Sequence, residues 1–144
     1  MKRLMGTSND VALTILRVVL GVVFFAHGAQ KMLGWFGGFG FHATVGAFTH
    51  LGMPPAMAYL IICTEFFAGL GLIFGLLTRI AAFGVGGLMV GAIFMVHLPF
   101  GFFMNWMGSQ KGEGIEFHLL ALAMAGALLL RGAGGFSLDG ALSK

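Results

Sequence analysis

The chain has 144 residues, of which 58% are hydrophobic and only 9% are charged, and its mean hydropathy is +0.97. This apolar surface exceeds what a soluble domain of this length can bury, so the composition predicts a single small domain (residues 1–144) dissolved in a lipid bilayer. Eight basic and five acidic residues give a net charge of +3, and the basic residues are spread along the chain, which excludes a nucleic-acid-binding patch. The single cysteine, Cys63, excludes an internal disulfide.

Four apolar segments follow one another along the chain, each close to the ~20 residues that a membrane-spanning helix needs. They cover about residues 10–33, 55–77, 79–98 and 115–130. Their limits agree with local signals, because Asp10 can cap the first helix and Pro99 stops the third. The sequence therefore predicts an all-α membrane protein folded as a four-transmembrane-helix bundle.

The connection between the first and second apolar segments, residues 34–53, is too apolar for a solvated loop and too rich in glycine for another span. Within it, Phe41, Val45 and Phe48 recur at helical spacing. A short helix over about residues 40–51, lying in the membrane interface, is therefore expected.

The basic residues predict the orientation of the bundle. One side of a four-span layout carries Lys2, Arg3, Arg79, Arg131 and Lys144. The other side carries only Lys31 and Lys111, together with Trp35 and Trp106, which are expected at headgroup depth. The positive-inside rule then places both termini in the cytoplasm.

A few ionisable side chains lie inside or at the ends of the apolar segments, where a charge costs about 3 kcal/mol or more. They are Arg17, His27, Lys31, Glu65, His97 and Glu116. Such groups persist where they face one another or a wet cavity, and they mark a pathway, a ligand site or a proton relay. The sequence thus predicts a buried polar site.

Helical rise places Arg17 and Glu65 both near the membrane midplane, at 1.5 Å per residue. A direct pair between them is the simplest arrangement, because each buried charge needs a counter-charge. Such a pair either fixes the helix register or takes part in a relay, and the sequence leaves both readings open.

A second layer of polar groups is expected nearer the outer face, where His27, Lys31, His97 and Glu116 reach the same depth. Glu116 and His118 are two residues apart, about 200° around a helix, so they cannot both point at one centre. We expect Glu116 to point inward. Lys31 either contacts a ligand or extends its ammonium to the interface.

Several site classes are absent from the sequence. There is no phosphate-binding glycine loop, no Cys–His pattern at zinc spacing and no nucleophile elbow, so no metal site is expected and no catalytic residue is assigned. His27 and His97 could in principle face each other across the bundle and ligate a haem, but haem is the disfavoured cofactor.

Short motifs in a fixed order resemble the DoxX family of small four-helix bacterial membrane proteins. They are LRVVLG around Arg17, HGAQKMLGW at 27–35, LGMPP at 51–55, GLLTRIAA at 75–82 and GFSLDG at 135–140, together with Glu65, His97 and Glu116. The resemblance extends over nearly the whole chain and departs from the family pattern at the aromatic insertion GGFGFHATVGAFTH. It implies a redox-linked membrane function, because the family is similar to a subunit associated with quinol oxidation and to small partners of thiosulfate:quinone oxidoreductases.

On this resemblance, His27 and His97 would hold a quinone headgroup and Glu116 would tune them. Two alternatives remain: a non-catalytic structural or assembly subunit of a larger membrane complex, and a protein that binds or transports a small or lipid-like molecule. The expected partners are the lipid bilayer and either a homo-oligomer or a larger membrane complex.

Overall fold

The computed structural model describes residues 5–143, so that Lys2, Arg3 and Lys144 lie outside the described residues, and within this range it contains helices and no strand. The α-helices are α2 (Val11–Leu33), α3 (Phe41–His50), α4 (Pro55–Phe74), α5 (Thr78–Ala92), α6 (Glu116–Arg131) and α7 (Leu138–Leu142). Three short elements complete the order: η1 (Trp35–Gly37), the π-helical turn η2 (Ile93–His97) and η3 (Leu98–Phe100). The all-helical class predicted from the sequence is confirmed.

Three helical segments are long and apolar enough to cross a membrane: Val11–Leu33, Pro55–Phe74 and Thr78–Phe100. The third joins α5, η2 and η3 into one continuous segment, which we call the α5 unit. Helix α6 has 16 residues, so its length is about 24 Å, which is shorter than the ~30 Å of a bilayer's hydrocarbon core.

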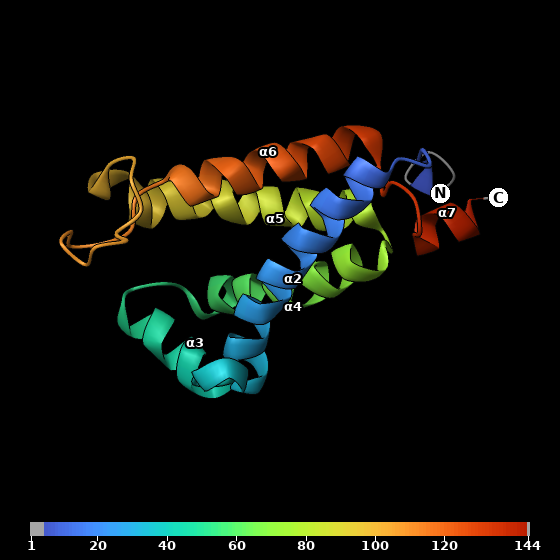
Figure 1. Cartoon of the computed structure of the whole chain (residues 1–144). Coiled ribbons are helices and arrows are strands. Elements are labelled where there is room, and N and C mark those ends of the chain that lie inside the picture. The colour runs from blue at the N-terminus through green and yellow to red at the C-terminus, as the bar shows by residue number, and fades with distance from the viewer. Residues whose placement is uncertain (1–4, 144) are drawn as a thin grey trace.

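Glycines set the closest helix contact, which lies between α2 and α4 where the two helices cross (Figure 1). A Cβ atom at Gly28 would lie 2.5 Å from the Cα of Phe66, and one at Gly21 would lie 2.7 Å from the backbone nitrogen of Ile73. Gly69 of α4 meets the backbone of α2 in the same way. Small residues allow helix backbones to approach this closely in membranes. The contact therefore fixes the register of the two helices.

Helices α5 and α6 form the second pair, side by side (Figure 1). One apolar core joins both pairs: Leu20, Phe24, Ala68, Leu72, Ala81, Ala82, Val85, Met89, Ala121, Ala125 and Leu128. We call the end of the molecule where α2 begins the Arg17 end, and the end where the loop 101–115 joins the α5 unit to α6 the His97 end. The C-terminal end of α2 lies well apart from the His97 end in Figure 1.

Asp139 of α7 closes the Arg17 end. Its carboxylate is 1% exposed and accepts hydrogen bonds from the backbone N–H groups of Leu77 at 2.7 Å and Thr78 at 2.8 Å. Its own N–H donates to the carbonyl of Gly75 at 2.8 Å. Because the first N–H groups of a helix lack intrahelical partners, Asp139 caps α5 from a distant part of the chain.

Candidate functional site

Arg17 is buried at the Arg17 end, where its side chain is 1% exposed. It donates five hydrogen bonds to backbone carbonyls: Nε to Ala133 at 2.8 Å, Nη1 to Leu72 at 2.6 Å and Ile73 at 2.7 Å, and Nη2 to Phe136 at 3.0 Å and Gly135 at 3.4 Å. The expected pair with Glu65 is therefore wrong. Arg17 instead caps the last turn of α4, whose final carbonyls have no intrahelical partner.

Glu65 pairs with Lys31 across the α2–α4 contact. The Lys31 ammonium donates to both carboxylate oxygens and lies 2.6 Å from Oε1. The two side chains are 25% and 10% exposed, for Lys31 and Glu65 respectively. Gly28 lies against the backbone of Glu65 and Phe66, which brings Lys31, one turn further along α2, over the carboxylate. Either charge alone would be uncompensated in a largely buried place.

His27 lies one turn before Lys31 and is exposed on the surface of α2. Among His27, Lys31 and Glu65, it is the most exposed residue. The structure therefore keeps His27, Lys31 and Glu65 in one region, which we call the Lys31 cluster.

His97 and His118 form a second cluster at the His97 end. Their ring centroids are 4.1 Å apart, with the ring planes at 42°. His97 is half-buried, and its Nδ1 lies 2.8 Å from the carbonyl oxygen of Glu113. A carbonyl cannot donate a hydrogen, so Nδ1 carries it and Nε2 of the neutral ring keeps its lone pair. His118 is 5% exposed, and within the described part of the chain its buried Nδ1 makes no hydrogen bond of good geometry, although the ring lies close to the backbone of Gly114.

The structure contradicts the expectation that Glu116 points inward. Glu116 is half-buried and turns toward the loop, where its Oε1 accepts hydrogen bonds from the Met104 N–H at 2.7 Å and the Trp106 Nε1 at 3.2 Å. As the first residue of α6, it also lies where the positive end of the helix dipole favours a carboxylate. The inward-facing residue is His118.

A sequence signal for His118 exists. The buried residues of α6 are His118, Ala121, Ala125 and Leu128, at the spacing of one helix face. The small residues Ala121 and Ala125 mark the face that packs on α5, and His118 lies on the same stripe.

The predicted site residues thus fall in three places rather than in the two layers expected. Arg17 lies at one end, the Lys31 cluster lies between α2 and α4, and His97 and Glu116 lie at the His97 end with His118. The ring of His97 packs on His118. The C-terminal end of α2, the helix that carries His27, lies apart from the His97 end (Figure 1). The facing pair considered for a haem does not form.

The family model described as DoxX matches residues 12–98, a stretch that contains Arg17, the Lys31 cluster and His97. The chain belongs to the DoxX family. Two relatives of this DoxX protein agree over nearly the whole length. It is 33% identical over 135 residues to "Putative oxidoreductase CatD" of Bacillus subtilis (strain 168), covering 94% of this chain and 90% of the relative.

It is also 30% identical over 136 residues to "Inner membrane protein YqjF" of Escherichia coli (strain K12), covering 94% of this chain and 95% of the relative. No solved structure matches it. Family membership and the apolar helices make this DoxX protein a membrane protein, with one relative named for oxidoreductase activity.

The two clusters of this DoxX protein offer different chemistry. In the Lys31 cluster the ammonium and the carboxylate satisfy each other. In the histidine pair one nitrogen keeps a lone pair and another is buried without a partner. Imidazole nitrogens in this state can accept, donate or exchange a proton near neutral pH. The histidine pair is therefore the site with hydrogen-bonding capacity left for a ligand.

Proposed function

We propose that this protein is a redox-linked integral membrane protein that binds the headgroup of a quinone or quinol at His97 and His118. The observation that carries the proposal is the buried Nδ1 of His118, which has no partner among residues 5–143. A buried polar atom of this kind calls for an explanation, and the carbonyl or hydroxyl oxygen of a ligand supplies one. The relative named as an oxidoreductase supports the redox reading.

The proposed role of each residue follows from the hydrogen bonds at the His97 end. Quinol oxidation releases protons together with electrons, so a base must lie at the ligand's hydroxyl group. His97 Nε2 is that base, because the Glu113 carbonyl fixes the hydrogen on Nδ1. Glu116 positions the loop above the pair through Met104 and Trp106. The electrons pass to a partner protein or a bound redox group.

The membrane arrangement is part of the proposal. Helix α6 serves as a fourth span, α3 lies in the interface, and both termini face the cytoplasm of a bacterial inner membrane. Support comes from Arg79 and Arg131 at the Arg17 end, which outnumber Lys111 in the loop at the opposite end, and from the relative named as an inner membrane protein.

A second candidate function is a non-catalytic assembly subunit of a larger membrane complex or a homo-oligomer. An apolar cavity of about 670 Å³ between α4 and α5 favours it, because a partner helix could pack there. Phe67, Phe74, Ile80 and Phe83 line this cavity and are exposed. In this reading the histidine pair is structural.

Native mass spectrometry of the protein, extracted from its own membrane in mild detergent, separates the two functions. We expect a bound quinone in the wild-type protein, and at least about a tenfold lower occupancy in His97→Gln and His118→Gln, equivalent to about 1.4 kcal/mol. His42→Gln, which changes an exposed histidine of α3, is the matched control and retains the quinone.

Thermal unfolding of each variant shows whether the fold survives. Equal quinone occupancy in all folded variants contradicts the proposed site. A quinone-free wild-type protein inside a larger complex supports the assembly subunit.

A further inference from the structure

The loop at the His97 end, residues 101–115, exposes large apolar side chains beside polar ones such as Lys111 and Glu113. Glu113 Oε2 accepts a hydrogen bond from the Asn105 N–H at 2.6 Å, and Glu116 holds the next turn of the loop. Phe102 and Phe103 are exposed, as are Trp106 (84%) and Met107 (92%). Large apolar side chains gathered on one exposed loop are unusual in water and are typical of a segment at a membrane interface.

The backbone of this loop is closed on itself. The N–H groups of Gly114, Ile115 and Glu116 donate to the carbonyls of Phe103 at 3.1 Å, Gly101 at 3.1 Å and Phe102 at 2.9 Å. The N–H of Gln110 donates to the side chain of Asn105 at 2.9 Å, and the Asn105 amide returns a bond to the Gln110 carbonyl at 3.0 Å. Unpaired backbone groups cost several kcal/mol each away from water, so internal pairing is what a loop needs in order to lie at membrane depth.

The helix lengths place the loop beside the α5 unit. Arg79 donates to the carbonyls of Leu129 and Leu130, which makes the Arg17 ends of α5 and α6 level. From that level α6 rises about 21 Å to Glu116, whereas the α5 unit rises about 31 Å to Phe100.

The loop occupies this difference of about 10 Å, because His97 binds the carbonyl of Glu113 and so holds the loop against the last turns of the α5 unit. A helix of ~30 Å matches the hydrocarbon core, so the loop lies near the boundary between acyl chains and headgroups.

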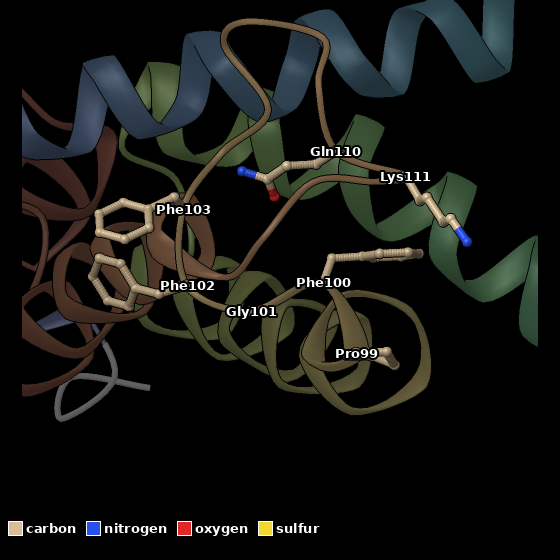
Figure 2. A pocket seen from close by; sticks show the side chains of 7 residues that line it. All are labelled: Pro99, Phe100, Gly101, Phe102, Phe103, Gln110 and Lys111. Carbon is tan, nitrogen blue, oxygen red and sulfur yellow. The ribbon is translucent and has the colours of Figure 1, made fainter.

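A recess opens between the aromatic side chains of the loop, with a volume of about 520 Å³. Figure 2 shows Phe102 and Phe103 on one side of it and Phe100 on the other, with the Gln110 amide between them and the Lys111 ammonium extending past Phe100. The Phe100 ring rests on the backbone of Gly112, where a Cβ would lie 2.6 Å from the ring.

We propose that the loop is embedded at the headgroup boundary of the leaflet on the His97 side, and that its recess takes an anionic phospholipid. The rings of Phe100, Phe102 and Phe103 contact the glycerol and upper acyl chain, and Lys111 contacts the headgroup phosphate. Aromatic and basic side chains favour this depth, and a basic residue near an anionic lipid surface strengthens binding. The site is separate from the proposed quinone site and does not depend on it.

Tryptophan fluorescence tests the depth of the loop, because the chain contains only Trp35 and Trp106. The Trp35→Phe variant, reconstituted at low density into phosphatidylcholine vesicles, leaves Trp106 as the reporter. We expect phosphatidylcholine brominated near the glycerol end to quench Trp106 more strongly than phosphatidylcholine brominated near the chain end, and aqueous iodide to quench it weakly. Strong iodide quenching without lipid quenching overturns the embedding, and so does the absence of both, which would mean that protein covers the loop.

The same reporter tests the recess, with brominated phosphatidylglycerol diluted into plain phosphatidylcholine. In Trp35→Phe we expect about a fivefold preference for phosphatidylglycerol around Trp106. Adding Lys111→Gln removes the preference, whereas adding Arg131→Gln, an exposed cation at the Arg17 end, leaves it unchanged. An unchanged preference in the Lys111→Gln variant, or no preference in any variant, overturns the recess as an anionic phospholipid site. Quinone occupancy is measured separately, so failure of one proposal leaves the other standing.

Discussion

The two ends of the molecule treat their polar groups differently. At the Arg17 end, the guanidinium of Arg17 binds five carbonyls and the carboxylate of Asp139 binds two N–H groups, all from the backbone. The Thr78 Oγ1 and the Arg79 Nε at this end are buried without a partner in the described chain. At the His97 end, His118 is equally buried but its Nδ1 has no partner in the described chain, and an aromatic loop is exposed. The comparison teaches that burial of a charge in a membrane bundle does not by itself indicate function. Unused hydrogen-bonding capacity on an imidazole, which can also exchange a proton near neutral pH, is the better indication.

Replacing Arg17 is expected to have the largest effect on stability. Arg17→Lys keeps the charge, but one ammonium has three hydrogens and cannot reach five carbonyls on separate segments. We expect a loss of about 3–5 kcal/mol in the free energy of unfolding, the range for breaking a buried charged network. Unfolding in mixed detergent with increasing dodecyl sulfate measures it.

The matched control is Arg131→Lys, which changes an exposed arginine at the same end and should shift stability by no more than about 0.5 kcal/mol. Equal unfolding midpoints for both variants would show that the carbonyl contacts of Arg17 contribute little.

Disrupting the Lys31–Glu65 pair is expected to have the second-largest effect on stability. Glu65→Gln alone should cost about 2–3 kcal/mol, less than a fully buried pair because Lys31 is 25% exposed. A double-mutant cycle with Lys31→Met should give a coupling of about 0.5–3 kcal/mol, as expected for residues in contact. The same cycle between Arg17 and Glu65 should give a coupling near zero. A larger coupling energy between Arg17 and Glu65 than between Lys31 and Glu65 would instead support the Arg17–Glu65 pair that the sequence predicted.

Disrupting the α2–α4 contact is expected to have a smaller effect on stability, and a glycine elsewhere provides a matched control. Gly28→Ala places a methyl group 2.5 Å from the Cα of Phe66, so we expect a loss of about 1–3 kcal/mol. Gly87→Ala on α5 meets nothing within 4 Å and should be neutral or stabilising by up to about 1 kcal/mol, because alanine favours the helix. Thermal unfolding of both variants in the same detergent measures the difference, and equal midpoints would mean that α2 and α4 are not in backbone contact.

Asp139→Asn is expected to have the smallest effect, about 1 kcal/mol, because asparagine still accepts one of the two N–H groups at the start of α5. Hydrogen exchange of the Leu77 and Thr78 amides should accelerate, while the amides in the middle of α5 should not. Unchanged exchange at both positions would exclude the cap.

The helices could be predicted from the sequence because apolar length and caps are local properties. The long segments begin and end close to the expected residues, and the helix expected at 40–51 is α3 (Phe41–His50). The π-helical turn at Ile93–His97 could not be foreseen, because no residue in it marks a change of helical pitch.

The partners of the buried charges could not be predicted, because depth along each helix says nothing about which faces meet. Arg17 and Glu65 were assigned similar depths, but the glycine contacts between α2 and α4 set Gly28 beside Glu65 and so bring Lys31 to that carboxylate. The same register places Arg17 at the end of α4, against Leu72 and Ile73. The glycines that fix the register were visible in the sequence, but their pairing required both helices together.

The carbonyls around Arg17 also constrain how the chain is made. Arg17 lies in the first long helix, yet Ala133, Gly135 and Phe136 follow it by 116 to 119 residues. During synthesis, which proceeds from the N-terminus, this guanidinium must wait for almost the whole remaining chain before its hydrogen bonds are complete. A ribosome that stops before the segment after α6 would leave a charged, half-assembled helix in the bilayer. The segment after α6 is therefore the last part of the chain that the Arg17 contacts require.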